Sequence, residues 1–274
     1  MNRAELADLI VARLSEAAET ARDAFQTPGR IASAWIDDLL PPDIAAEIHA
    51  RFPDPETMAL KRSIKERKRV AAQMDQYDPL LEEVVYAFQD PRVVELIGEI
   101  TGLRALEPDF DLYAGGISLM GQGDYLRPHL DNSHDGTRAR YRVLNLLYYV
   151  TPDWSEADGG ALQLWDQGPL TTPRTVASLF NRLVLMITDR TSWHSVNKVR
   201  RDGRRCCVSN YYFSTVSPDA ADYFHATSFR GERAGAGDLV MQADNGLRTA
   251  VLRTLPGVYK NPHVYNRRPE ADPV

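Results

Sequence analysis

The chain has only two cysteines, no long apolar run and no excess of positive charge. Cys206 and Cys207 are adjacent, so on a strand they would point to opposite faces, which argues against a structural disulfide and favours reduced thiols. No stretch approaches the roughly 20 apolar residues of a membrane span, and the first residues lack the basic-then-apolar pattern of a secretory signal. These absences predict a cytoplasmic protein without a membrane role.

The formal charge of -6 over 274 residues creates no general field that would attract nucleic acid, so we expect no nucleic-acid partner. Lys61 to Arg69 is a local exception, rich in Lys and Arg. We interpret this segment as a solvated loop or helix face in preference to a partner-binding patch. The hydrophobic content of 43% suffices for a sizeable core, and nothing in the sequence indicates the oligomeric state.

The first third of the chain has the pattern of helices. Apolar residues recur at three- and four-residue spacing from Ala4 to Phe25, which predicts an amphipathic helix. A second helix is expected at 44–51, capped by Asp43 after two prolines, and further helices at 79–88 and 91–100, each opened by a proline. We therefore expect residues 1–104 to form a helical region that packs on a core.

From about residue 105 short β-rich runs replace the helical pattern. They lie at 116–120, 141–150, 161–165, 183–188 and 206–214, separated by Gly, Asp, Asn and Pro. This spacing predicts a β-sandwich or barrel core over 105–260, followed by a polar tail at 261–274. The expected class is α+β with a mostly β core, acting as a single functional domain.

Three residues have the pattern of a metal site. On a strand, His129 and Asp131 would point to one face while Leu130 points to the other. His194, 65 positions later, can supply a third ligand from a distant strand. Two histidines and one carboxylate leave open positions on an iron(II) ion, as non-haem oxygenases require. An H-x-D pair alone is weak evidence. We expect the remaining histidines to be exposed or structural; they are His49, His134, His225 and His263.

A keto acid bound to such an ion needs a cation for its distal carboxylate, and the bidentate fork of Arg suits this role. Arg205 begins an apolar run 11 positions after His194. A strand there would place Arg205, Cys207, Ser209 and Tyr211 on one face and turn Arg204 outward. Tyr149 could be a second anchor, although a core tyrosine with a satisfied hydroxyl is an equal alternative.

Several segments occur in the order of one known family. They are 125–132, 147–154, 158–162, 181–186, 194–196 and 205–213. Together they resemble the iron(II)/2-oxoglutarate-dependent dioxygenases of the prolyl 4-hydroxylase type, and 147–199 is especially similar to the ribosomal-protein prolyl hydroxylases. Two features depart from the family. Met120 stands where some relatives carry a cosubstrate-binding tyrosine, and 217–265 has no counterpart that we can place.

The resemblance implies a double-stranded β-helix, or jelly roll, with N-terminal helices packed on it. It implies His129, Asp131 and His194 as iron ligands and catalytic centre, and Arg205 and Tyr149 as 2-oxoglutarate contacts. Dioxygen would be consumed, with L-ascorbate as the reductant. The implied reaction hydroxylates an aliphatic C–H bond, of a prolyl or other amino-acid residue, free or in a protein.

Two alternatives stay open at this point. One is a tailoring oxygenase that acts on a glycan or a secondary metabolite, because likeness of fold does not determine the substrate. The other is a cupin-like protein that binds a metal or small ligand without turnover. Arg205 favours an enzyme over the cupin-like protein, because a mere metal binder has no use for a buried cation beside the site.

Overall fold

The computed structural model describes residues 1–219, 221–232, 234–254 and 265. The helices of this part are α1 (Arg3–Phe25), α2 (Pro42–Ala50), α3 (Pro79–Ala87), α4 (Pro91–Thr101) and α5 (Ala236–Thr254). Its strands are β1 (Ser33–Ile36), β2 (Ala59–Arg62), β3 (Glu66–Ala71), β4 (Leu106–Pro108), β5 (Gly116–Gly121), β6 (Tyr125–Leu130), β7 (Tyr141–Tyr149), β8 (Leu162–Leu164), β9 (Arg174–Val176), β10 (Arg182–Ile187), β11 (His194–Val196), β12 (Arg204–Ser214) and β13 (Ser228–Phe229).

The strands form one curled antiparallel sheet with two halves. One half has the order β1-β10-β7-β12-β5, and the other has the order β6-β11-β8-β9. β3 pairs with both β5 and β6 and so joins the halves at one side. This is the double-stranded β-helix that the sequence predicted, and the α+β class with a mostly β core is confirmed.

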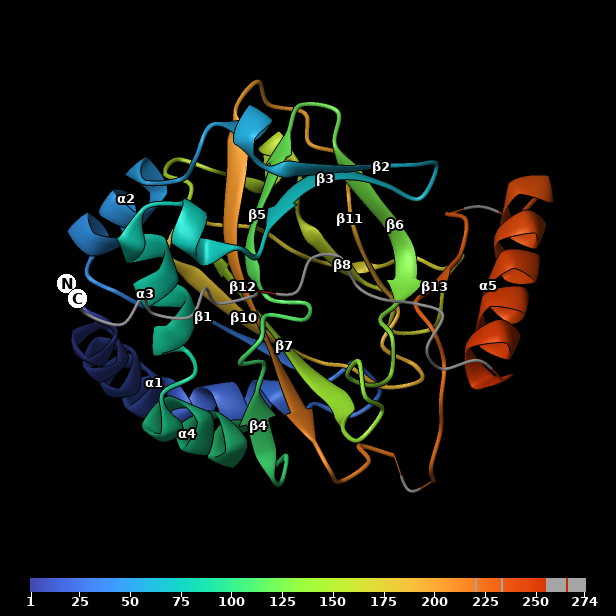
Figure 1. Ribbon diagram of the computed structural model, residues 1–274, viewed down its shortest axis with the longest axis horizontal. Coiled ribbons are helices and arrows are strands. Elements are labelled where there is room, and N and C mark those ends of the chain that lie inside the picture. Colours follow the sequence, from blue (N-terminus) through green and yellow to red (C-terminus); the bar gives the residue numbers. More distant parts are fainter. Residues whose placement is uncertain (220, 233, 255–264, 266–274) are drawn as a thin grey trace, which may run out of the picture.

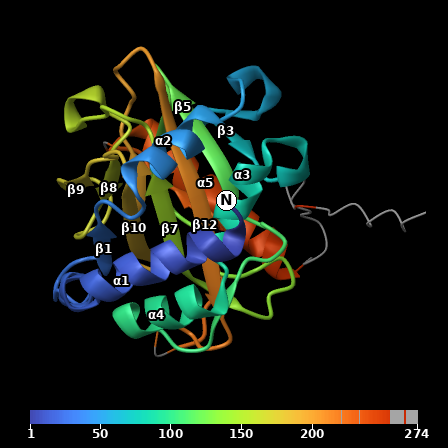
Figure 2. The same cartoon turned by 90° about the vertical axis from the view of Figure 1, so that its left-hand side faces the viewer.

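Helices α1 to α4 cover the outer face of the larger half, as Figure 1 and Figure 2 show, while α5 lies apart beside β13. The central strand β7 is therefore buried on both faces. Leu144, Leu146 and Tyr148 pack with the helices, whereas Asn145 and Tyr149 face the interior of the barrel. Two-sided burial explains why this strand is a nearly continuous apolar run.

The adjacent cysteines lie on β12 and follow the same alternation. Cys206 packs in the core under the helices, and Cys207 packs inside the barrel. Both are free thiols, as predicted from their adjacency. Burial raises the pKa of Cys206 to about 12, so this thiol stays protonated and unreactive near neutral pH.

The apolar stripe of α1 attaches this helix to the rest of the molecule. Leu6, Ile10 and Leu14 are fully buried. We expect Ile10→Ala to lower the free energy of unfolding by about 2–5 kcal/mol, because it removes buried methyl and methylene groups and leaves a cavity. Urea unfolding followed by circular dichroism measures this change. Glu19→Ala, at an exposed position of the same helix, is the control. An equal loss in both variants would contradict the packing argument.

The predicted helices are present with small shifts at their ends. The second begins at Pro42 instead of residue 44, and Asp43 lies in its first turn instead of capping it. Asp78 and Asp90 do cap their helices: each side chain accepts a hydrogen bond of 2.9 Å from a backbone amide in the first turn of α3 or α4. A proline directly before a helix can start it without a side-chain cap.

The interpretation of Lys61 to Arg69 as a solvated loop or helix face was wrong. This segment forms most of the β2–β3 hairpin, and β3 is the strand that joins the two halves of the sheet. Because most of its residues are charged, the segment lacks the alternation of apolar and polar residues by which a strand is predicted. Arg62 and Arg67 are exposed, whereas Lys61 and Lys68 line an internal pocket with their aliphatic stems partly covered.

Residues 217–265, for which the sequence offered no structural counterpart, contain β13 and α5. Of the expected polar tail at 261–274 only Tyr265 lies within the described residues. β1 and β3 precede residue 105 but pair with strands that follow it. In the described ranges, no helix is both long and apolar enough to cross a membrane.

Candidate active site

The pairing of β6 with β11 brings the three predicted metal ligands together. His129 lies near the end of β6, Asp131 follows that strand directly, and His194 opens β11 opposite His129. The two imidazole rings are 4.1 Å apart between centroids. The Nε2 atoms of His129 and His194 lie 3.7 and 3.5 Å from the Asp131 carboxylate oxygens. One ligand atom from each residue can therefore reach a single ion.

Backbone carbonyls orient both histidines. Nδ1 of His129 is 3.0 Å from the Arg127 oxygen, and Nδ1 of His194 is 2.9 Å from the Ser192 oxygen. A carbonyl only accepts, so Nδ1 carries the proton and the Nε2 lone pair faces the centre. Burial lowers the pKa of His129 to about 3 and also lowers that of His194, so both imidazoles are neutral. These are the states that a divalent metal requires.

Two residues of β7 hold Asp131. The Arg142 guanidinium lies 3.0 Å from its carboxylate, and the Asn145 amide donates to the same oxygen at 2.8 Å. Burial alone would raise the pKa of Asp131, but the charge of Arg142 and the hydrogen bond from Asn145 lower it, so the carboxylate is ionised. Neither Arg142 nor Asn145 was predicted. Asn145 could have been predicted as a site residue, because it is a polar residue in an apolar run and lies on the same strand face as Tyr149.

Arg205 lies inside the barrel, and no acidic side chain in the described part of the chain neutralises its positive charge. Its side chain is buried, and Nε donates to the Ser178 hydroxyl at 3.2 Å. Within the described residues no carboxylate lies at ion-pair distance from it. Gly160 makes room for this arginine, because a Cβ at residue 160 would come within 2.8 Å of the Arg205 Cδ. A buried guanidinium without an acid is costly unless an anion binds there.

Tyr149 lies against Arg205, with the guanidinium carbon 4.7 Å from the centre of its ring. Its hydroxyl is buried and makes no hydrogen bond of good geometry with the described residues. Burial raises the pKa of this hydroxyl, while Arg205 opposes the shift. The phenol is therefore neutral and retains an unused donor. Tyr149 does not itself line the pocket beside the metal ligands.

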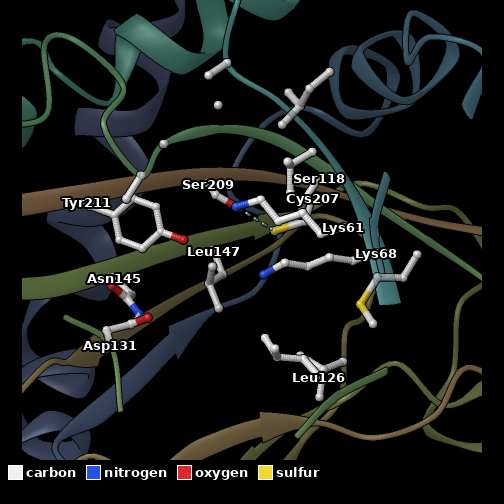
Figure 3. A pocket seen from close by; sticks show the side chains of 18 of the residues that line it. Lys61, Lys68, Ser118, Leu126, Asp131, Asn145, Leu147, Cys207, Ser209 and Tyr211 are labelled. Atoms are coloured by element: carbon white, nitrogen blue, oxygen red, sulfur yellow. Dashed lines mark hydrogen bonds between the residues drawn. The ribbon is translucent and has the colours of Figure 1, made fainter. Parts of the chain in front are cut away.

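One pocket of about 930 Å³, open to solvent, joins these groups. Figure 3 shows part of its lining, with Asp131 and Asn145 together at one wall. As predicted from the alternation of β12, Arg205, Cys207, Ser209 and Tyr211 all line it, and Arg204 is exposed. Met120 also lines the pocket. The site therefore combines three side chains that could hold a metal ion with a buried cation in a single cavity.

The other histidines take no part in this centre. His49 lies half-buried in α2, His134 is buried with Nδ1 2.8 Å from the Ser133 hydroxyl, and His225 is half-buried. Among the residues that the structure describes, the three predicted ligands form the one cluster of metal-ligating side chains. His263 lies outside those residues.

Comparison with known proteins supports the family expected from the motifs. Residues 115–213 match the family model of the 2OG-Fe(II) oxygenase superfamily. The match covers 99 of the 274 residues and supports the resemblance noted from the motifs. The family is defined by iron(II) and 2-oxoglutarate, the metal and cosubstrate that the sequence predicted.

The chain is also similar to one curated relative and to two solved structures. The chain is 32% identical over 97 residues to "Prolyl 3-hydroxylase OGFOD1" of Xenopus laevis, covering 34% of this chain and 18% of that protein. A prolyl 4-hydroxylase from Phytophthora capsici superposes with a TM-score of 0.54 at 19% identity, covering 91% of this chain and 78% of that chain. The epimerase SnoN from nogalamycin biosynthesis gives 0.53 at 14%, with 82% and 97% covered. These two structures support the fold alone.

Proposed function

We propose that this protein is an iron(II)- and 2-oxoglutarate-dependent dioxygenase that hydroxylates an aliphatic C–H bond, with a prolyl or other amino-acid residue, free or in a protein, as its substrate. The observation that carries the proposal is the cavity shared by His129, Asp131, His194 and Arg205. A neutral His pair with an ionised carboxylate suits iron(II), and a buried arginine without an acid suits the distal carboxylate of a keto acid.

Each residue near the pocket has a defined task in this proposal. His129, Asp131 and His194 would hold the metal. Once bound, the metal would supply the oxidising power together with 2-oxoglutarate and dioxygen, and succinate and carbon dioxide would be the coproducts. Arg142 and Asn145 keep the carboxylate of Asp131 ionised and oriented. Placement of the cosubstrate is the task of Arg205. Ser178 and the ring of Tyr149 contact Arg205 in turn.

Ser178 accepts a hydrogen bond from Arg205, and the Tyr149 ring lies against its guanidinium. The unused Tyr149 hydroxyl would complete the anchor if the bound cosubstrate comes within its reach. We further propose that residues 1–104, 105–260 and 261–274 work as one functional unit, since β1 and β3 pair with strands of the core. L-Ascorbate as reductant and a cytoplasmic location also belong to the proposal.

The prolyl substrate is supported by the relative named a prolyl 3-hydroxylase, of which the chain spans less than a fifth. The fold leaves the tailoring oxygenase as an alternative, because a prolyl 4-hydroxylase and SnoN superpose about equally well. A cupin-like binding protein without turnover accounts less well for Arg205, since such a protein would bury a cation with no benefit.

Succinate formation tests the proposed chemistry without knowledge of the substrate. Protein incubated with iron(II), ascorbate and 2-oxoglutarate in air should form succinate slowly, because cosubstrate oxidation can proceed uncoupled. A chelator should abolish this formation, and added iron(II) should restore it, since the site itself holds the metal. Succinate is measured by mass spectrometry, with boiled protein as control. Protein that binds neither iron(II) nor 2-oxoglutarate would refute the proposal.

A further inference from the structure

The β2–β3 hairpin places two lysines directly opposite each other. Lys61 of β2 and Lys68 of β3 are cross-strand partners. Like charges in such positions destabilise a sheet, so this pair calls for a compensating negative charge. Glu66 supplies one for Lys68, at 3.2 Å. Lys61 has no hydrogen bond or ion pair with any residue that the structure describes.

Lys61 is also held in a place where its charge is poorly solvated. Burial lowers its pKa, Lys68 and Arg142 add to the shift, and Glu66 opposes it. Figure 3 shows the side chains of Lys61 and Lys68 extending from the hairpin into the pocket, toward the side where Asp131 and Tyr211 lie. The hairpin thus presents an unpaired amine to the same cavity as the metal ligands.

The cavity continues outward into a space of about 1380 Å³ that Lys61, Lys68, His129 and Asp131 also line. Arg138 lines this outer part with its guanidinium 4.3 Å from the Phe224 ring centre, and it donates to a backbone carbonyl of α5. It has no ion pair with a carboxylate among the described side chains. The outer space therefore holds a second cation without an acidic partner.

The acidic residues that line the outer space are already neutralised. Glu66 pairs with Lys68, Asp131 with Arg142 at 3.0 Å, and Asp135 with Arg140 at 2.9 Å. The positive charges of Lys61 and Arg138 are left over, although the whole chain carries a net charge of -6. A basic recess in an acidic protein attracts anions to that recess selectively.

The wall beside the metal ligands has the opposite character. Leu126, Ala226 and Phe229 line the outer space, and the Phe229 ring stacks on His129 with 5.3 Å between centroids. An aliphatic group would bury its surface against this wall, close to the metal ligands. The two parts of the recess therefore suit the two ends of one molecule, one aliphatic and one negatively charged.

We propose that the substrate of this site carries a carboxylate, that Lys61 binds this carboxylate, and that Arg138 adds to the field that attracts it. The inference rests on the proposed function and specifies its substrate class. The carboxylate can be the α-carboxylate of a single amino acid or an acidic side chain near the reacting residue of a peptide. Arg205 remains the anchor for the cosubstrate, because it lines only the inner pocket.

Paired probes that differ only in charge test the inference. The protein is loaded with 2-oxoglutarate and paramagnetic Mn²⁺ under nitrogen, and broadening of probe NMR lines reports binding beside the ion. One pair is N-acetyl-L-proline and its amide. The other is a terminally blocked Glu-Pro-Glu peptide and its Gln-Pro-Gln counterpart. We expect one acid, at least, to bind about tenfold more tightly than its amide, and the pair that discriminates identifies the source of the carboxylate.

Three variants assign the preference to Lys61. Lys61→Gln should reduce the preference for the acid to near unity, whereas Lys61→Arg should keep most of it because the charge is retained. Arg62→Gln removes the same charge from the neighbouring position, which is exposed and outside the pocket, and should keep the full preference. Thermal unfolding of each variant verifies that the hairpin and fold are intact.

Two results would overturn the inference while the proposed function stands. The first is that neither acid is preferred over its amide by wild-type protein. The second is that Lys61→Gln leaves the preference unchanged but raises the 2-oxoglutarate concentration needed for succinate formation, which would place Lys61 at the cosubstrate. Protein that leaves the EPR signal of free Mn²⁺ unchanged would refute the iron site itself, and this inference with it.

Discussion

Replacing His194 with alanine should lower 2-oxoglutarate-dependent succinate formation by more than about 100-fold, because loss of a direct ligand exceeds the 10–100-fold effect of residues that merely orient ligands. His194 is the ligand of choice for this experiment. Its Nε2 lies 3.5 Å from the Asp131 carboxylate, and its Nδ1 forms a hydrogen bond with the backbone carbonyl of Ser192. Its removal therefore leaves no other side chain uncompensated, and the fold should survive.

The matching experiment on Asp131 is less clean. Arg142 is buried against this carboxylate, so Asp131→Ala would leave a buried cation unpaired and cost about 3–5 kcal/mol of stability. Asp131→Asn keeps the shape of the side chain and reduces that problem.

His49→Ala, which removes a half-buried imidazole from α2, is the control for His194→Ala. Iron content and thermal unfolding should be measured with turnover. Full turnover by a folded His194→Ala protein would contradict the proposed metal centre.

Removal of the Arg205 side chain should have the second largest effect. We expect Arg205→Ala to raise the concentration of 2-oxoglutarate needed for half-maximal succinate formation by about 100-fold, equivalent to about 2.7 kcal/mol. The physical reason is that the distal carboxylate would enter a buried pocket with no fixed cation. Steady-state measurement over a range of 2-oxoglutarate concentrations gives this value, and iron binding should be retained because Arg205 is not a ligand.

Two variants control this result. Arg204→Ala removes the same charge one residue earlier, at an exposed position, and should leave the 2-oxoglutarate requirement unchanged. Arg205→Lys keeps a charge but loses the bidentate fork, so its effect should be intermediate. If Arg204→Ala and Arg205→Ala had equal effects, the anchor would have to be sought elsewhere in the pocket.

The elements that have local signals could be predicted from the sequence alone. The period of four in α1, the prolines that open α3 and α4, and the runs of β5, β7, β10 and β12 each arise from neighbouring residues, and the structure contains them all. The spacing of His129 and Asp131 and the alternation along β12 likewise predicted which side chains share a face. The side chain of Arg205 faces the pocket and that of Arg204 does not.

Features that depend on pairing between distant strands could not be predicted without the three-dimensional structure. Arg142 and Asn145 meet Asp131 because β7 lies across the barrel from the end of β6, and no local pattern encodes that approach. The β2–β3 hairpin was missed for a related reason. Strand β3 consists mostly of charged residues. Partial burial of these side chains becomes favourable only when their charged ends extend into a pocket.

The same physical reason explains why the proposed metal and cosubstrate residues could be predicted from the sequence, whereas the proposed substrate recess could not. The residues proposed to hold a metal and a keto acid occur in the order of a known family, so the sequence alone could indicate them. The recess of Lys61 and Arg138 is assembled from the hairpin, the segment before β7 and α5. Its charge and shape arise from side chains that are far apart in the chain, and only their positions in space bring them together.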